Sequence, residues 1–295
     1  MNPREEGFLL LTSHLGDPER PVLTAAQLRV LAQRVAQLEP AQPERDMTAR
    51  DLQLLGYNRE MSQRIVGLLA DRQKLEAYRA RGEGLDCIPI TRVSTGYPLI
   101  LRQRLGLDSP GCLWAKGDLR ILSTPAIALV GSRELRESNR RFAEEVGYQA
   151  ALQGLTLVSG NARGADRTAQ AACLGAGGRV ISIVADELAK QPVRRNQLYL
   201  SEDGYDEAFS AQRALHRNRC IHALGRMVFA AQSDLGKGGT WDGTVKNLRF
   251  GWSPVAVFRD GSEAAAELER MGAYGVDTKD LLDFLSIPVI TESFL

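Results

Sequence analysis

The feature that most restricts the fold is a series of short apolar segments in the second half of the chain. These segments are rich in β-branched residues and lie at 127–130, 155–158, 180–184, 227–230 and 255–258. Stretches of helical character separate them, at 138–153, 165–174, 217–224 and 240–250. Strands that alternate with helices in this way form a sheet with helices on both faces. The sequence therefore predicts an α/β fold with a doubly wound, mostly parallel sheet.

The first 85 residues follow a different pattern. Apolar residues recur every three or four positions over 24–38, where Thr24 is the expected N-cap and Pro40 follows the segment. A capping box at Thr48 opens a short helix, and a third helix ends near Gly82. We therefore expect residues 1–85 to form a small all-helical domain and residues 86–295 to form the sheet domain, with short helices at its C-terminal end.

The composition excludes several classes of protein. With 25% charged and 44% hydrophobic residues, the chain is neither mainly disordered nor collagen-like nor a coiled coil. The 37 Lys and Arg against 36 Asp and Glu give a net charge of +1, so the chain is no polycation, although a local basic patch is compatible with that total. No apolar run approaches the roughly 18 residues that cross a bilayer, and no secretory signal is visible. We expect a cytoplasmic protein.

The four cysteines, Cys87, Cys112, Cys173 and Cys220, lie far apart in the sequence and form no Cys-x-x-Cys pair. Neither a disulfide framework nor a zinc site follows from such spacing. We expect all four thiols to be reduced and mostly buried.

Three predicted strand ends combine glycine with a cation or a hydroxyl group. Glycines let the backbone approach a ligand, and a helix that begins there adds partial positive charge, so such loops can bind phosphate. Turn geometry alone also explains the glycines of any one loop, but three loops at one sheet edge indicate a single continuous site. The loop residues in this predicted site are Gly131, Ser132, Arg133, Ser159, Gly160, Arg163, Gly164, Lys237, Gly238, Gly239 and Thr240.

A fourth element is an arginine-rich segment without acids. Between positions 208 and 233 the chain contains Arg213, Arg217, Arg219 and Arg226 and no Asp or Glu. Guanidinium groups bind phosphate oxygens through two parallel hydrogen bonds, and Asn218 can reach phosphate or base edges. Alternatively, these arginines pair with the acids at 202–207. We favour phosphate contact by Arg217, Asn218 and Arg219.

The better-known catalytic and cofactor signatures are missing from the sequence. The loop at 236–240 lacks the P-loop spacing, and Gly160 with Gly164 is not the dinucleotide fingerprint. The three histidines, His14, His216 and His222, belong to no hydrolytic triad or metal-binding motif. We therefore predict no catalytic residue, no metal and no cofactor.

The order and spacing of these motifs resemble the DprA (Smf) family of DNA-processing proteins. The matching segments, between about positions 85 and 258, are 96–99 (Gly-Tyr-Pro-Leu), 109–117, 127–133, 159–166, Arg217-Asn218-Arg219 and the Lys237 loop. The resemblance implies a Rossmann-like sheet with a basic pocket that binds single-stranded DNA. It also implies a mediator that helps to load RecA recombinase during natural transformation, without established catalysis and commonly as a homodimer. The pocket residues it implies are Arg133, Ser159, Gly160, Arg163, Gly164, Arg217, Asn218, Arg219 and Lys237.

The chain departs from the family pattern at several positions. Ala214-Leu215-His216 stands where the family usually has Phe-Pro-Arg, Asn161 and Ala165 replace Leu and Ile, and the run from Gly239 to Gly243 replaces Ser-Gly-Ser. Only 37 residues follow Phe258. We therefore expect the C-terminal winged helix of many members to be absent.

A second function class remains open because Ala162-Arg163-Gly164-Ala165-Asp166 is also similar to nucleotide sensors and to phosphoribohydrolases of the Lonely Guy type. Those hydrolases carry a catalytic glutamate where this chain has Gly243, with Asp242 next to it. The alternative is a nucleotide sensor or nucleotide N-glycosidase, including one that acts in defence. A pure protein-binding scaffold is disfavoured by the cation-rich strand ends. The sequence does not decide the pathway, the dimer interface, the choice between DNA and a free nucleotide, or the roles of Trp241 and Asp242.

Overall fold

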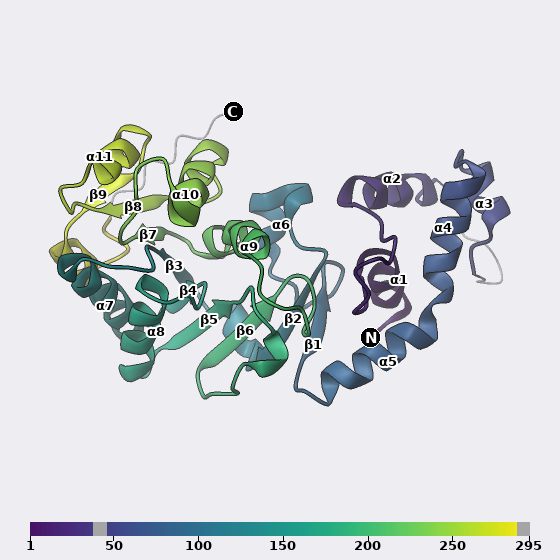
Figure 1. The fold of residues 1–295 in the computed structure, drawn as a ribbon, viewed down its shortest axis with the longest axis horizontal. Helices are drawn as coiled ribbons and strands as arrows, with labels where there is room; N and C mark the ends of the chain where they lie inside the picture. The colour runs from purple at the N-terminus through teal and green to yellow at the C-terminus, as the bar shows by residue number, and fades with distance from the viewer. Residues whose placement is uncertain (38–45, 288–295) are drawn as a thin grey trace.

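The computed structural model describes residues 1–37 and 46–287 (Figure 1). The described part of the chain before the first strand is helical. Its helices are α1 (Pro3–Thr12), α2 (Ala25–Val35), α3 (Ala49–Leu54), α4 (Arg59–Ala70) and α5 (Arg72–Glu83). The side chains of Thr24 and Thr48 accept hydrogen bonds from the third backbone N–H group of α2 and α3, which confirms both predicted N-caps. Leu38 and Pro40 lie outside the described residues.

The third predicted helix is divided into α4 and α5 at Asp71. Arg20, which is 4% exposed, donates hydrogen bonds to the carbonyl oxygens of Ser13 and Leu68 and to the Asp71 carboxylate. The helix break therefore lies at the point where the buried Arg20 guanidinium donates hydrogen bonds to the end of α4 and to Asp71. Because Arg20 is distant in sequence from Asp71, helical periodicity could not reveal the break.

Within the described residues one sheet has nine strands in the order β1-β2-β6-β5-β4-β3-β7-β8-β9. The pairs β1–β2 and β2–β6 are antiparallel, and all other pairs are parallel. The predicted α/β fold with a mostly parallel sheet is thus confirmed. The strands are β1 (Ile88–Thr91), β2 (Cys112–Gly117), β3 (Ala126–Val130), β4 (Thr156–Ser159), β5 (Arg179–Ile183), β6 (Gln197–Ser201), β7 (Val228–Ala230), β8 (Val255–Phe258) and β9 (Tyr274–Val276).

The order of the strands creates a topological switch point between β3 and β7. From β3 the chain adds β4, β5 and β6 on one side, and β7 then pairs with the other side of β3. The connection that leaves β3 therefore leads to β4 on one side, and the connection that leaves β7 leads to β8 on the other side. A crevice opens at the carboxyl ends of strands at such a point, and ligands of doubly wound sheets bind there.

Helices cover both faces of the sheet. The helices α7 (Glu137–Leu152) and α8 (Ala165–Gly175) pack on one face, where Ile127 and Leu129 of β3 point. The helices α6 (Leu99–Leu105), α9 (Ala211–Leu224), α10 (Gly238–Phe250) and α11 (Glu263–Arg270) lie on the opposite face, toward Ala128 and Val130 (Figure 1). Short 3-10 helices complete the fold: η1 (Gly106–Asp108), η2 (Leu119–Ser123), η3 (Leu188–Lys190) and η4 (Thr278–Leu282).

The four cysteines are free and buried, as predicted. Burial raises the pKa of the Cys87 and Cys173 thiols to about 11. These thiols therefore stay protonated and act as apolar core groups. A separate property of the described helices is that none is long and apolar enough to cross a membrane.

His222 of α9 is fully buried, and its Nδ1 lies 3.1 Å from the Asn247 side-chain nitrogen of α10. Burial lowers the pKa of His222 from 6.5 to about 3. The folded protein thus holds the neutral imidazole, so the stabilisation is complete above pH 6.5 and is lost as the pH falls toward 3. We expect this histidine to contribute a slope of about 1.4 kcal/mol per pH unit to the free energy of unfolding in that window.

Chemical denaturation of wild type and His222→Gln between pH 3.5 and 7.5 measures this contribution. The difference in unfolding free energy between the two proteins should shrink as the pH falls. His216→Gln, which changes an exposed histidine of the same helix, serves as the control. A difference that is constant with pH in the His222 variant would contradict the prediction.

Candidate nucleic-acid interface

A pocket of about 400 Å³ lies at the switch point, and we name it the switch-point pocket. It is bounded by the loop after β3, the loop after β7, the beginning of α10 and one side of α9. The sequence-predicted residues that line it are Gly131, Ser132, Arg133, Arg217, Asn218, Lys237, Gly238, Gly239 and Thr240. The predicted residues Ser159, Gly160, Arg163, Gly164 and Arg219 are not among its lining residues.

The beginning of α10 supplies several of the polar groups of this pocket that remain available. Lys237 is the N-cap residue of this 13-residue helix, its side chain makes no capping hydrogen bond, and no other side chain of the described residues caps the first backbone N–H groups. The side chains of Arg133 and Lys237 are exposed and make no hydrogen bond or ion pair within the described residues. Free N–H groups, the helix dipole and two free cations together favour an anion.

The floor of the switch-point pocket contains a buried carboxylate and a buried guanidinium. Asp166 accepts hydrogen bonds from the backbone N–H groups of Gly160 and Ala162, at 3.0 and 3.1 Å. Arg217 is 8% exposed and donates to the Gly160 carbonyl oxygen at 2.6 Å. Burial raises the pKa of Asp166 and lowers that of Arg217, and the attraction between the two opposes both shifts. Both side chains therefore fix the loop after β4.

Close contacts leave no room for a side chain at either glycine of that loop. Gly164 has φ +85°, and a Cβ atom there would lie 2.4 Å from the carbonyl oxygen of Ser132 and 2.5 Å from that of Arg133. A Cβ atom on Gly160 would lie 2.3 Å from the Arg217 guanidinium. These contacts place the loop after β4 directly beneath the Ser132-Arg133 loop. The two glycines thus support the pocket from behind.

The two remaining residues of this loop make protein contacts outside the pocket. The Ser159 hydroxyl is buried and accepts a hydrogen bond from the Gln170 side chain at 2.5 Å. Arg163 is exposed and lies 3.4 Å from the Glu134 carboxylate. Neither arrangement presents a free group to the switch-point pocket.

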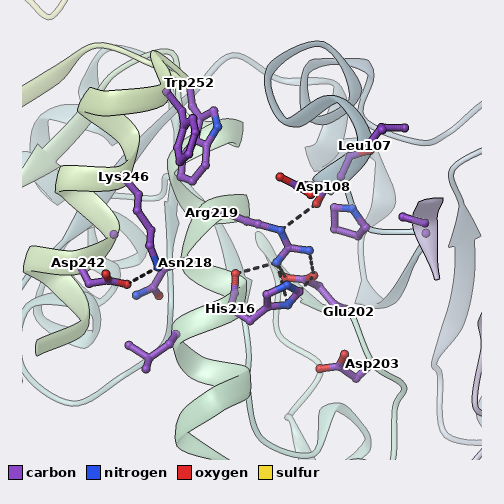
Figure 2. Close-up of a pocket in the computed structure, with 17 residues that line it drawn as sticks. Leu107, Asp108, Glu202, Asp203, His216, Asn218, Arg219, Asp242, Lys246 and Trp252 are labelled. Carbon is purple, nitrogen blue, oxygen red and sulfur yellow. Dashed lines mark hydrogen bonds and ion pairs between the residues drawn. The ribbon is translucent and has the colours of Figure 1, made fainter.

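Arg219 lies in a second pocket of about 520 Å³, between η1, α9 and α10, which we name the lateral pocket (Figure 2). Its guanidinium makes two hydrogen bonds to the Glu202 carboxylate, at 2.6 and 3.1 Å, and a third to the Asp108 carbonyl oxygen. Arg213 is similarly paired with Asp203 at 2.7 Å. For these two arginines the structure shows the pairing with acids of 202–207 that the sequence left as the alternative.

Sequence reasoning missed the loop directly after β7. Gln232, Ser233 and Asp234 line the switch-point pocket, and the Ser233 hydroxyl is buried without a hydrogen-bond partner in the described structure. The available signal was the change from apolar to polar residues after Ala231. That signal points to a ligand site only when β7 is known to neighbour β3, and the sequence does not give the strand order.

Comparison with known proteins identifies relatives of this chain. The family model of DNA recombination-mediator protein A matches residues 89–286. The DNA processing proteins DprA of Streptococcus pneumoniae and Bacillus subtilis are 32% and 35% identical over 141 and 169 residues, which are 44% and 54% of this chain. The chain spans about half the length of these curated relatives, 50% and 55%.

Solved structures of relatives share the fold. The DprA structure from Streptococcus pneumoniae superposes with a TM-score of 0.70 at 22% identity, over 96% of this chain and 98% of that one. A DprA structure from Helicobacter pylori that concerns single-stranded DNA binding superposes with a TM-score of 0.57 at 25% identity, over 68% of this chain and 95% of that one. The family model covers well over half of the chain, and the DprA/Smf resemblance of the sequence motifs is confirmed. The chain belongs to the DNA recombination-mediator protein A family.

Proposed function

We propose that this protein binds single-stranded DNA in the switch-point pocket and acts as a recombination mediator that assists RecA loading. The observation that carries the proposal is the uncapped beginning of α10 beside the free cations Arg133 and Lys237. Membership of the mediator family and the DNA binding described for the Helicobacter pylori relative support it.

The chemistry of the pocket favours phosphate contacts over base readout. Its free groups include backbone N–H groups and two cations, which bind phosphate oxygens without regard to sequence, and beside them lie the Ser233 hydroxyl and the exposed Asp234 carboxylate. The Asn218 side chain, which could read a base edge, donates instead to the Gly239 carbonyl oxygen at 3.1 Å. We therefore propose binding that is strong at low salt and nearly independent of sequence.

Lys237→Ala tests this proposal. We expect the variant to lose about tenfold in affinity for an oligothymidine, because it removes one charge-assisted contact of about 1.4 kcal/mol. The slope of log affinity against log salt should also fall by about 0.7, the value for one phosphate on a single strand. Fluorescence anisotropy between 50 and 300 mM salt measures both quantities.

The control is Lys279→Ala, which removes an exposed lysine outside the pocket. It should bind as the wild type does. A wild-type slope near zero, or equal slopes for the Lys237 and Lys279 variants, would count against DNA binding at the switch point.

We further propose that bound nucleotides are not cleaved. The carboxylates that line the switch-point pocket are Asp166, which is buried and hydrogen-bonded, and the exposed Asp234. Asp242, beside the position of the Lonely Guy glutamate, lines the lateral pocket and pairs with Lys246 at 2.8 Å. This arrangement supports binding over cleavage, because hydrolysis needs a positioned acid or base at the reacting bond.

The assay incubates the protein with nucleoside monophosphates, NAD and oligonucleotides, with and without magnesium. We expect no release of base, ribose phosphate or shortened strands. Turnover that disappears in Asp242→Asn or Asp234→Asn would instead support the nucleotide-cleaving alternative.

The proposal extends to the organisation of the protein and its partners. We propose that residues 1–85 are an accessory module on the sheet domain of residues 86–295, and that the protein is a homodimer. Light scattering measures the molar mass in solution and so tests whether the protein is a homodimer. RecA filament assembly on strands coated with single-strand binding protein, with and without this protein, tests the mediator role.

A further inference from the structure

The switch-point pocket continues into a longer groove. The lateral pocket shares Leu215 and Asn218 with it. At its other end, the lateral pocket shares Ala25, Leu107 and Ser109 with a third pocket of about 740 Å³. This third pocket, the interdomain cleft, lies between α1, α2, α4 and the segments around β1 and η1. In Figure 1 the helices α10, α9, α6 and α2, which contribute residues to these pockets, follow one another across the molecule.

Arginines surround the interdomain cleft. Arg4, Arg29 and Arg102 are exposed, line the cleft and make no hydrogen bond or ion pair within the described residues. Arg92 also lines it and donates to a backbone carbonyl, that of Gly106. These residues come from α1, α2, α6 and the end of β1, so only the fold gathers them.

The acids of the cleft do not neutralise these arginines. Among the described lining residues the acids are Glu202 and Asp203. Glu202 already binds Arg219 at 2.6 Å, and Asp203 binds Arg213 at 2.7 Å. The cleft therefore carries an excess of positive charge that faces solvent, which favours a polyanion.

The middle of the groove has a different character. The lateral pocket is lined by Asp108, Glu202, Asp203 and Asp242 against Arg219 and Lys246, so it offers little attraction to phosphate. Two of its other residues, Phe250 and Trp252, stack at a centroid distance of 5.6 Å, and Phe250 is 61% exposed. An exposed aromatic surface stacks on bases of any sequence. The groove thus has cationic surfaces at its two ends and an aromatic surface between them.

The relative position of the two cationic ends is fixed by packing. Tyr78 of α5 packs against Trp114 of β2 and against Tyr205, at centroid distances of 5.3 and 4.5 Å. The Tyr205 hydroxyl donates to the Tyr78 carbonyl oxygen, and Arg81 donates to the Tyr205 hydroxyl. These contacts join the N-terminal helices to the sheet, so a strand must have a minimum length to reach both ends.

We propose that the interdomain cleft is a second phosphate-binding site for the same single strand of DNA that occupies the switch-point pocket. This inference rests on the proposed function. A long strand contacts Arg133 and Lys237 at one end of the groove, places bases against Trp252, and contacts Arg29 and Arg102 at the other end. A short strand occupies the switch-point pocket alone.

The test compares oligothymidines from about 5 to about 25 nucleotides, a range around the site sizes of known single-strand binding folds. The proteins are wild type, Arg29→Ala/Arg102→Ala and the control Arg59→Ala/Arg195→Ala, which removes two exposed arginines outside the three pockets. We expect wild type and control to gain affinity above a threshold length. The Arg29/Arg102 variant should bind short strands normally and lose that gain, with a salt slope for long strands lower by about 1.4, or about 0.7 for each lost contact.

Several results would overturn the inference. One is equal binding of the Arg29/Arg102 variant and wild type at every length, and another is an equal loss at short and long lengths. Normal DNA binding with weaker binding of anilinonaphthalene sulfonate would assign the cleft to small organic anions instead. Lys237→Ala tests the proposed function separately: if it leaves binding unchanged at every length, the switch-point pocket is not the DNA site, whatever the arginine variants show.

Discussion

Replacement of Gly164 by alanine is expected to lower the free energy of unfolding by about 2–5 kcal/mol. Two effects add. Alanine is strained at φ +85°, and its Cβ atom would lie 2.4 and 2.5 Å from two backbone carbonyl oxygens, of Ser132 and Arg133, which cannot move independently of the loop after β3. The lower entropy of the unfolded alanine chain offsets a small part of this cost. Urea denaturation followed by circular dichroism measures the change.

Gly177→Ala is the matched control for Gly164→Ala. Gly177 has a similar φ of +78°, but a Cβ atom there meets nothing within 4 Å. The control should lose about 1 kcal/mol, from strain alone. Gly164→Ala should also weaken oligothymidine binding, because the displaced loop carries Arg133. If both glycine variants lost the same stability, the close approach of the two loops would not matter energetically.

Replacement of Arg217 by alanine is expected to lower the free energy of unfolding by about 3–5 kcal/mol, the usual cost of leaving a buried charge without its partner. Arg217 and Asp166 are both buried beside Gly160, and Arg217 opposes the burial effect that raises the pKa of Asp166. The Gly160 carbonyl oxygen would also lose its donor at 2.6 Å. Thermal and chemical denaturation measure the loss.

The comparison variants for Arg217→Ala are Arg195→Ala, an exposed arginine, and Lys237→Ala at the pocket rim. Both should keep wild-type stability, and Lys237→Ala alone of these two should lose DNA affinity. If Arg217→Ala kept full stability but lost DNA binding, Arg217 would be a direct phosphate ligand, as the sequence pattern first suggested.

The buried parallel strands were predictable from the sequence because they are buried on both faces. Strands β3, β4, β5, β7 and β8 appear as short apolar runs rich in β-branched residues, and helical segments alternate with them, which distinguishes them from an apolar run within a helix, such as residues 8–11 of α1. The strands β1, β2, β6 and β9 were missed. In β2, Lys116 is only 8% exposed, and its ammonium group donates a hydrogen bond to the Ala189 carbonyl oxygen. In β6, Gln197 is buried, and its side-chain amide donates a hydrogen bond to the Ser182 hydroxyl. Buried polar residues with distant partners conceal a strand from a pattern of hydropathy.

The sequence also located the loops at the strand ends, but not the task of each residue in them. Glycine, arginine and asparagine form the same local sequence pattern whether they bind a ligand or contact another loop of the protein. Lys237 is free at the beginning of α10, whereas Arg217 is held beneath the pocket and Arg219 is bound by Glu202. The difference arises from partners that lie 57 residues from Arg217 and 17 residues from Arg219 in the sequence.

By itself, the amino-acid sequence determined the α/β class, the N-caps of α2 and α3, and the family motifs, since each depends on residues close together in the chain. Only the tertiary structure decided the strand order, the switch point between β3 and β7, and the gathering of Arg4, Arg29, Arg92 and Arg102 around one cleft. The physical reason is that charge pairing and burial depend on distance in space, and local patterns do not contain that distance.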